Sequence, residues 1–223
     1  MLNFVVDPRI VASLVPPGTE IDFENGETFL SVVGFLFLDT RLLGLPIPLH
    51  RDFEEVNLRF YVRKKSADTW RRGVVFIREL VPRRAIALVA RAFYGENYLA
   101  LPMKHQINHV DLKLSVEYFW RRGRKWESLK ISASSEPQSI SAGSHAEFIT
   151  EHYWGYTWVR GGCSEYRVEH PRWKVWNANT FEFSADVAAL YGQQFVEPLT
   201  TPPRSAFIAD GSAISVERKE ILL

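Results

Sequence analysis

The sequence has little of several features that would narrow its class at once. Only one of its 223 residues, Cys163, is a cysteine, so no disulfide can form within the chain, and a reducing compartment is expected. The formal net charge of +1 gives no overall attraction to nucleic acid or acidic membranes. The longest apolar run, residues 29–38, is about half a membrane span, and no basic leader precedes the first apolar residues. We therefore expect a soluble, cytoplasmic protein.

The composition is that of one folded domain. Hydrophobic residues make up 46% of the chain and charged residues 24%, as in ordinary globular proteins. A chain of this length can bury a sizeable core. Because no repeat, low-complexity tract or linker interrupts it, we expect a single domain over residues 1–223.

Alternating hydrophobicity indicates that strands dominate. In residues 55–63 the apolar side chains occupy every second position, and residues 110–120 show a longer alternation of the same kind. Turn signals predict three hairpins, centred on Arg122-Gly123, Gly161-Gly162 and Asp210-Gly211.

Three short helices are also predicted. The first covers residues 82–94, with a proline at its start and apolar residues at helical spacing. The second begins at Ser144, with Glu147 as a capping-box partner. The third covers residues 184–192. A few outer helices on a strand-dominated chain predict an α+β domain built on a strongly curved sheet or barrel.

Residues 72–80 form a strand that is apolar on both faces and then carries Arg78 and Glu79. Adjacent strand residues point to opposite faces, so these two side chains do not pair with each other. Either one of them lines an internal pocket, or the strand emerges into solvent before Pro82.

Residues 50–57 concentrate charged side chains, among them His50 and Glu54. Carboxylates beside an imidazole can transfer protons when they converge, but charged loop residues are more often simply solvated. The spacing of His145 and His152 matches no zinc pattern, so we expect no metal.

Residues 95–105 end in Pro-Met-Lys-His behind an apolar stretch. A Schiff-base lysine must be neutral, which requires desolvation or a nearby cation. The apolar neighbours of Lys104, with His105 or Arg78 as the cation, can meet that need. The alternative is a solvated loop.

Two aromatic segments suggest other ligands. Residues 117–127 combine basic and aromatic side chains, a pattern of single-stranded nucleic-acid binding. They span a hairpin turn in a nearly neutral chain, however, so no nucleic-acid partner is expected. The aromatic residues of 151–158, including Tyr153, can line a ligand cavity or simply fill the core.

Several long motifs resemble the YqjF-like family of uncharacterised bacterial proteins. They are "PPGTEIDFENGETFLSVVGFLFLDTRLLGLPIPLHRDFEEVNLRFYVR", "GVVFIRELVPRRAIALVARAFYGENYLALPM", "TEHYWGYT", "EYRVEHPRW" and "ALYGQQF". This family is grouped with the acetoacetate decarboxylase-like superfamily. The resemblance implies a closed, cone-like structure of antiparallel strands with a few outer helices and an interior cavity.

Residues 95–104, "GENYLALPMK", resemble the decarboxylase stretch that carries the Schiff-base lysine. Aligned on Pro102, the nucleophilic lysine falls on Met103, and only the second, electrostatic lysine is matched, by Lys104. The decarboxylase's strand glutamate falls near Val33, and its arginine falls around or before Met1. The family usually carries a further N-terminal segment with a Trp-Arg pair. The resemblance therefore implies a truncated chain, a misassigned start, or a variant that lacks one strand and an arginine.

Three functional hypotheses follow. The chain binds a small anionic or carbonyl-containing metabolite in its cavity; or it is an oxo-acid enzyme with a Lys104 imine; or it is a structural or interaction protein without a ligand. No cofactor or membrane partner is expected, and a homo-oligomer stays open. The candidate catalytic residues are Lys104, Glu79 and Glu54, and the candidate ligand-binding residues are Arg78, His50, Tyr98, His105, His152 and Tyr153.

Overall fold

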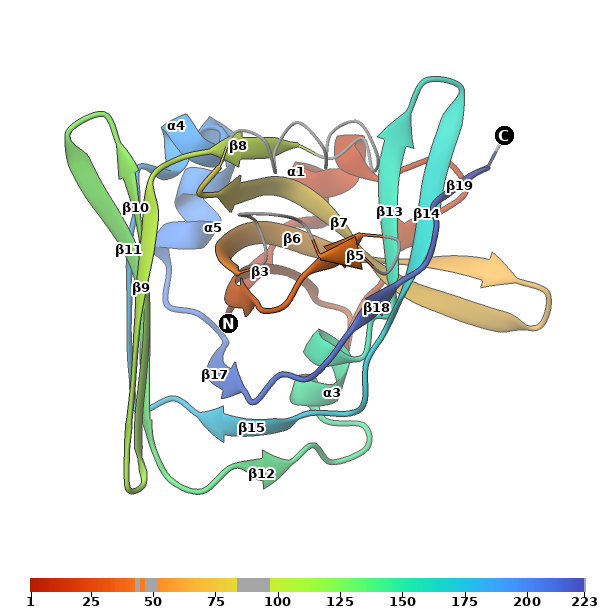
Figure 1. Cartoon of the computed structure of the whole chain (residues 1–223). Helices are drawn as coiled ribbons and strands as arrows, with labels where there is room; N and C mark the ends of the chain where they lie inside the picture. The colour runs from red at the N-terminus through yellow and green to blue at the C-terminus, as the bar shows by residue number, and fades with distance from the viewer. Residues whose placement is uncertain (43–44, 47–51, 84–96, 223) are drawn as a thin grey trace.

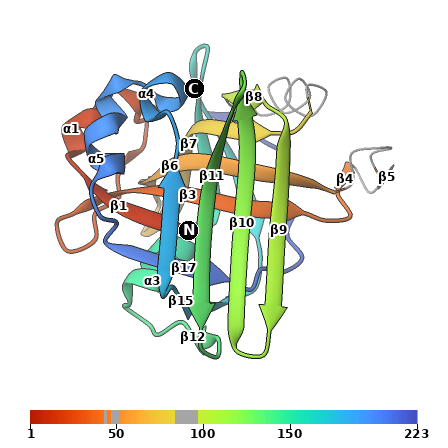
Figure 2. The same ribbon diagram turned by 90° about the vertical axis from the view of Figure 1, so that its left-hand side faces the viewer.

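Two β-sheets pack against each other, as the computed structural model describes for residues 1–42, 45–46, 52–83 and 97–222 (Figure 1). A large curved sheet forms the centre, and a four-stranded sheet stands along one side of it. The strands of the smaller sheet cross in front of those of the large sheet (Figure 2). The expected strand-dominated α+β architecture is therefore confirmed.

The large sheet has thirteen strands, ordered β12-β15-β17-β1-β3-β6-β7-β13-β14-β18, with β2, β8 and β19 paired beside this path. Within the described part of the chain, the end strands β12 and β18 do not pair with each other. The expected closed barrel is thus not formed by the described strands, because the sheet ends on each side in a strand of two residues. The strands are β1 (Leu2–Val6), β2 (Glu20–Ile21), β3 (Thr28–Phe37), β6 (Phe53–Ser66), β7 (Thr69–Val81), β8 (Tyr98–Ala100), β12 (Gln138–Ser139), β13 (Trp154–Val159), β14 (Gly162–Glu169), β15 (Lys174–Asn177), β17 (Ser205–Ala209), β18 (Ser215–Val216) and β19 (Glu220–Leu222).

The four-stranded sheet has the order β16-β11-β10-β9. Its inner face follows the predicted alternation, because Leu114, Tyr118 and Trp120 are all buried. The alternation does not extend back to residue 110: Val110 is 66% exposed, since residues 111–112 form the turn between two strands. The strands are β9 (Met103–Val110), β10 (Lys113–Arg122), β11 (Lys125–Ser134) and β16 (Thr180–Ser184); β4 (Arg41–Leu42) and β5 (Leu45–Pro46) form a separate pair.

Two of the three predicted hairpins are confirmed. β10 pairs with β11 across Gly123-Arg124, and β13 pairs with β14 across Arg160-Gly161. The hairpin predicted at Asp210-Gly211 is wrong. There β17 pairs with β1 and β15, whereas β18 pairs with β14, so the turn carries the chain between distant parts of the sheet.

The helices are short. The predicted cap at Ser144 is confirmed: its hydroxyl accepts a hydrogen bond from the Glu147 amide at 3.2 Å. The third predicted helix starts later than expected, because Asp186 caps it and Ser184 still belongs to β16. The predicted helix at 82–94 lies almost wholly outside the described residues. The helices are α1 (Pro8–Val11), η1 (Ala12–Leu14), α3 (His145–Thr150), α4 (Val187–Tyr191), η2 (Gln193–Phe195) and α5 (Val196–Thr200). No described helix has the length and apolar character needed to cross a membrane.

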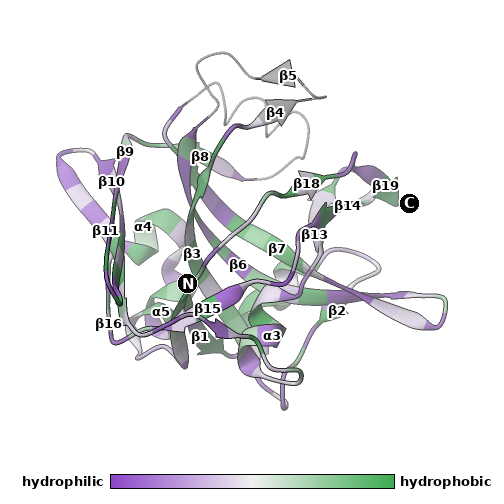
Figure 3. Cartoon of the chain, turned by 60° about the horizontal axis from the view of Figure 1, so that its bottom comes forward, coloured by the Kyte–Doolittle hydropathy of each residue, from purple (hydrophilic) through white to green (hydrophobic). Residues whose placement is uncertain are grey.

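The main core lies between the two sheets. Val56, Leu58, Phe60 and Val62 of β6 are fully buried there, as their alternation predicts. The opposite face of β6 is covered too, because Tyr61 packs in a second cluster with residues of α3. Figure 3 shows hydrophobic residues concentrated in the central strands, while the projecting tip of the β6–β7 hairpin is largely hydrophilic. One side of the large sheet therefore faces the smaller sheet and the other faces α3.

Candidate functional site between the two sheets

The register of β6 and β7 decides which charged side chains face the smaller sheet. Arg78 is opposite Leu58, whose side chain lies in the core between the sheets, whereas Glu79 is opposite Asn57 on the other face. An irregularity at Leu58/Arg59 leaves Ile77 as an extra residue, and bulges of this kind re-aim neighbouring side chains. Arg78 is thus directed to the face of β7 that also carries Leu80, toward the core between the sheets.

His105 of β9 lies on the same face of its strand as the core residue Met103, although His105 itself is exposed. Its partner in the register is Tyr118 of β10, whose side chain is buried. Glu54, at the start of β6, reaches the imidazole: its Oε1 lies 2.8 Å from Nδ1 of His105. The carboxylate is 15% exposed and the imidazole 39% exposed. Two candidates named separately from the sequence therefore form one carboxylate–imidazole pair.

Tyr118 completes this end of the site. Its ring centroid lies 6.4 Å from that of His105. Burial, and secondarily the negative charge of Glu54, raise the pKa of the Tyr118 phenol, so it stays protonated. Gly34 of β3 allows the ring to approach, because a Cβ there would lie 2.6 Å from Tyr118 Cδ2. The phenol is therefore a fixed hydrogen-bond donor beside the pair.

Tyr191 of α4 marks the other end of the interior. It is buried, and its hydroxyl has no hydrogen-bond partner in the described structure. Burial and the charge of Glu127 raise the pKa of Tyr191, while the nearby charge of Arg78 lowers it. Glu127 itself is engaged, since it accepts the Trp120 indole proton at 2.6 Å. The Tyr191 hydroxyl is thus a buried donor without a partner among the described residues, and the charge of Arg78 lies near it.

These five side chains define the inter-sheet site: Glu54, Arg78, His105, Tyr118 and Tyr191. In the tautomer whose Nδ1–H donates to the Glu54 carboxylate, Nε2 of His105 is a hydrogen-bond acceptor. Among the described residues, Nε2 has no partner. An oriented imidazole of this kind can accept or return a proton, and the arginine and phenols can hold an oxygen-rich anion.

Lys104 does not lie in this interior. Strand alternation turns Met103 into the core between the sheets and Lys104 outward, where its amine lies 5.1 Å from the Phe119 ring centroid and 4.8 Å from that of Trp126. The residue is exposed. The hypothesis of an amine held in a pocket is therefore wrong for Lys104 in this structure. Neighbouring residues of a strand point to opposite faces, and on β9 it is Met103 that points to the core.

The remaining predicted residues are not gathered at the inter-sheet site. Glu79 and Tyr98 are register partners in β7 and β8; Glu79 lies on the opposite side of the sheet from Arg78, and Tyr98 packs in a small cluster with Phe53. His50 lies outside the described residues.

His152 and Tyr153 follow α3 and lie in two other parts of the molecule. His152 is buried against Tyr61 and bonds Asp22 through Nε2 at 3.0 Å. Tyr153 donates to Glu151 at 2.6 Å and lines a surface groove of about 600 Å³ with Arg167 and His170. Neither residue reaches the inter-sheet site from there.

Sequence reasoning missed Tyr118 and Tyr191 as site residues. The alternation places Tyr118 on the apolar face of its strand without indicating a role, and Tyr191 carries no signal beyond its place in the motif "ALYGQQF". The available signal was Gly34 inside an apolar strand, since a glycine there marks close approach of another group. In the described part of the chain, no group of three or more metal-ligating side chains converges.

Solved structures with this arrangement define the fold class. The acetoacetate decarboxylase of Legionella pneumophila superposes with a TM-score of 0.60 at 13% identity, covering 100% of this chain and 83% of that one. The enduracididine biosynthesis enzyme MppR, solved in complex with pyruvate, gives 0.60 at 13% identity, covering 98% and 81%. The protein therefore has an acetoacetate decarboxylase-like fold. At these identities the likeness shows the fold alone.

The sequence comparisons are more specific. The family model DUF2071, described as an uncharacterized conserved protein, matches residues 1–213. The uncharacterized protein YqjF of Bacillus subtilis is 30% identical over 180 residues, which cover 79% of this chain and 71% of that protein. The chain belongs to the DUF2071 family, which confirms the resemblance that its motifs indicated.

Proposed function

We propose that the protein binds a small carboxylate that also carries a carbonyl group, such as a 2-oxo acid, in the inter-sheet site. The observation that carries this proposal is the Glu54–His105 pair, in which Nε2 of the imidazole has no partner among the described residues. An imidazole held by a carboxylate but otherwise unoccupied is a polar group prepared for a ligand atom.

The two ends of the site suit the two groups of such a ligand. Arg78 and Leu58 are opposite each other, four residues along β6 from Glu54, which corresponds to roughly 13 Å of strand. Long side chains reaching inward from both ends would contact a molecule of a few heavy atoms that binds between them. Arg78 and Tyr191 would hold the carboxylate, while His105 and Tyr118 would face the carbonyl oxygen.

The pyruvate complex of MppR supports the choice of ligand class, since that enzyme shares the fold. An imine at Lys104 is not part of the proposal, because its amine lies over Phe119 and Trp126 on the outer face. The ligand would be held by hydrogen bonds and ion pairing. Borohydride treatment with pyruvate should accordingly leave no adduct at Lys104.

The test is a thermal-shift screen with pyruvate and related 2-oxo acids, followed by calorimetry. A ligand that binds only the folded state adds about 3 kcal/mol of stability at roughly 100 times its Kd. We expect at least one acid to stabilise the wild type, and this stabilisation to disappear in His105→Gln. Lys104→Ala, one residue away on the outer face, is the matched control and should keep it. The proposal fails if no acid stabilises the wild type, or if His105→Gln responds like Lys104→Ala.

A further inference from the structure

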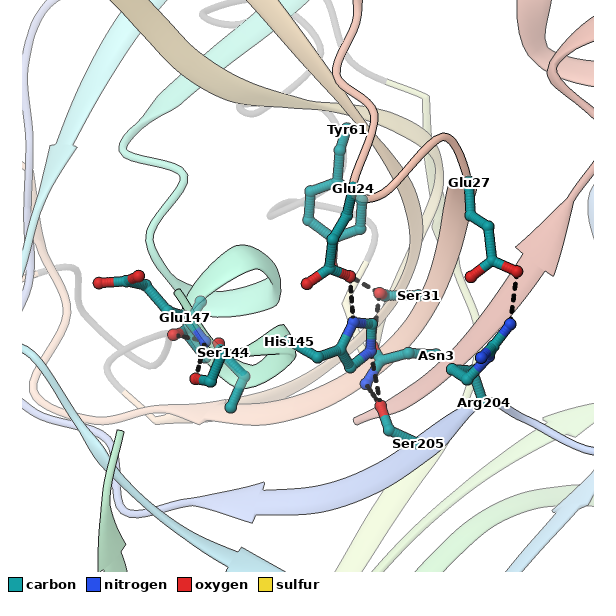
Figure 4. Close-up of polar contacts among 12 residues, drawn as sticks. Asn3, Glu24, Glu27, Ser31, Tyr61, Ser144, His145, Glu147, Arg204 and Ser205 are labelled. Carbon is teal, nitrogen blue, oxygen red and sulfur yellow. Dashed lines mark hydrogen bonds and ion pairs between the residues drawn. The ribbon is translucent and has the colours of Figure 1, made fainter. Parts of the chain in front are cut away.

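A second polar cluster lies on the other side of the large sheet, away from the inter-sheet site. Ser205 Oγ lies 2.9 Å from Nε2 of His145, and Nδ1 of the same imidazole bonds a carboxylate oxygen of Glu24 (Figure 4). A hydroxyl, an imidazole and a carboxylate in this order have the geometry of a nucleophile, its general base and the group that orients the base. We name these three residues the Ser205 triad.

Each member sits on backbone that is fixed locally. Glu24 is held by a two-residue turn: Asn25 and Gly26 both have positive φ (51° and 82°), and Glu24 and Glu27 exchange two backbone hydrogen bonds. His145 is the first residue of α3, directly after its cap. Ser205 begins β17 opposite Asn3 of β1. Rigid elements therefore set the distances within the triad.

The surrounding hydrogen bonds give the network one direction. Tyr61 donates to Ser31, because the Ser31 hydroxyl donates in turn to Oδ1 of Asn3 at 2.6 Å. The Asn3 amide then donates from Nδ2 to Ser205 Oγ at 2.8 Å. Since Asn3 already fills an acceptor position of Ser205, the serine proton is free to point at His145.

The same direction fixes the tautomer of His145. The Glu24 carboxylate accepts from Nδ1–H, which leaves the lone pair of Nε2 facing the Ser205 hydroxyl. This is the tautomer that a general base requires. Three neutral donors in series end on the serine oxygen, and they stabilise the negative charge that develops there when its proton leaves.

The triad is reachable from solvent. The His145 side chain is 25% exposed and that of Glu24 14%, and Ser205 is half-buried. The buried ring of Phe29 lies 4.8 Å from the imidazole and supplies an apolar wall. A short acyl chain suits this setting better than a bulky or highly charged one.

From these observations we propose that Ser205 is an activated nucleophile that hydrolyses esters of short-chain carboxylic acids. Ser205 Oγ attacks the ester carbonyl carbon while its proton passes to Nε2 of His145. The bond to the alcohol oxygen breaks, and that oxygen takes the proton from Nε2. Water, deprotonated by His145, then attacks the acyl-serine, releasing the carboxylic acid and returning the proton to Ser205.

The first experiment needs no variant. The full-length protein is incubated with an alkyl fluorophosphonate, and the modified serines are identified by mass spectrometry of peptides. Ser132 is the internal control, because it is also half-buried but, among the described residues, its hydroxyl bonds only the Ser115 hydroxyl. We expect one adduct, at Ser205. Labelling of Ser205 no faster than Ser132 overturns the proposal.

The second experiment measures hydrolysis of p-nitrophenyl acetate. Ser205→Ala should abolish release above the buffer rate, and His145→Gln should slow it about 100-fold, as expected for loss of a general base. Glu24→Gln should slow it while shifting the pH profile, which a merely structural role would not do. Lys104→Ala, on the other sheet, should match the wild type. Equal rates in the wild type and Ser205→Ala also overturn the proposal.

Discussion

His105 and His152 each bond a carboxylate, yet they lie on opposite sides of the large sheet and in different surroundings. Nδ1 of His105 lies 2.8 Å from Glu54, and the imidazole is 39% exposed. Nε2 of His152 lies 3.0 Å from Asp22, and that imidazole is 1% exposed. Asp22 also accepts from Arg72 at 2.6 Å, so its charge is already matched.

The difference in burial separates their roles. Desolvation is the largest cause that lowers the pKa of His152, to about 4, although the Asp22 hydrogen bond acts in the opposite direction. His152 is therefore neutral at pH 7 and works as a hydrogen-bond donor inside the fold. The pair at His105, in contrast, is partly exposed. A carboxylate–imidazole pair thus stabilises the fold when it is buried, and it is a candidate binding site when it is partly exposed.

The largest expected effect comes from Asp22→Asn. The change removes the negative charge that faces Arg72 and an oxygen that bonds His152, and breaking a partly buried ion pair leaves Arg72 without this counter-charge. We expect the free energy of unfolding to fall by about 3 kcal/mol. Urea denaturation at pH 7 measures it. Asp7→Asn, which also removes a carboxylate paired with an arginine but at an exposed position, is the control and should cost far less. Similar losses in both variants would contradict the role given to Asp22.

The pH dependence of stability tests His152 directly. Its folded pKa of about 4 lies below the ordinary histidine value of 6.5, so between these values the unfolded chain binds a proton that the folded protein does not. Stability is therefore fully present above pH 6.5 and falls as the pH drops toward 4, by about 3 kcal/mol at most. The pKa of Asp22 is also lowered, so its contribution is lost at still lower pH.

The measurement compares urea denaturation of the wild type and His152→Gln at several pH values from 7 to 4. The glutamine variant cannot bind this proton, so the difference between the two stability curves gives the contribution of His152 protonation. NMR titration of the imidazole gives the same pKa independently. A midpoint near 6.5 would show that His152 is not desolvated and would remove its contrast with His105.

Local patterns in the sequence were enough for much of the fold. The alternation in residues 55–63 predicts β6 because its apolar positions form one face of the core. The cap at Ser144 is likewise a local signal. The hairpin predicted at Asp210-Gly211 failed because a turn signal marks where the chain bends, not which strands pair afterwards; β17 and β18 find their partners far along the chain.

The site was harder to predict for the same reason. Strand periodicity requires Met103 and Lys104 to point to opposite faces, but it does not say which face is inner. That depends on the packing of β9 against β6. The partner of His105 is 51 residues away, so no local pattern pairs it with Glu54. Both residues were identified as candidates, and only the three-dimensional structure joined them.

The smallest expected effect belongs to Glu54→Gln. This variant keeps the size of the side chain and removes the charge facing His105 at a partly exposed position. Solvent screening limits such a pair, so the free energy of unfolding should change by less than about 1 kcal/mol. Urea denaturation beside Asp22→Asn makes the comparison within one experiment. If Glu54→Gln is as destabilising as Asp22→Asn, the pair at His105 holds the fold together in the same way as the pair at His152. A small loss of stability combined with lost response to 2-oxo acids would instead assign Glu54 to ligand binding, because a structural carboxylate cannot be removed at so low a cost.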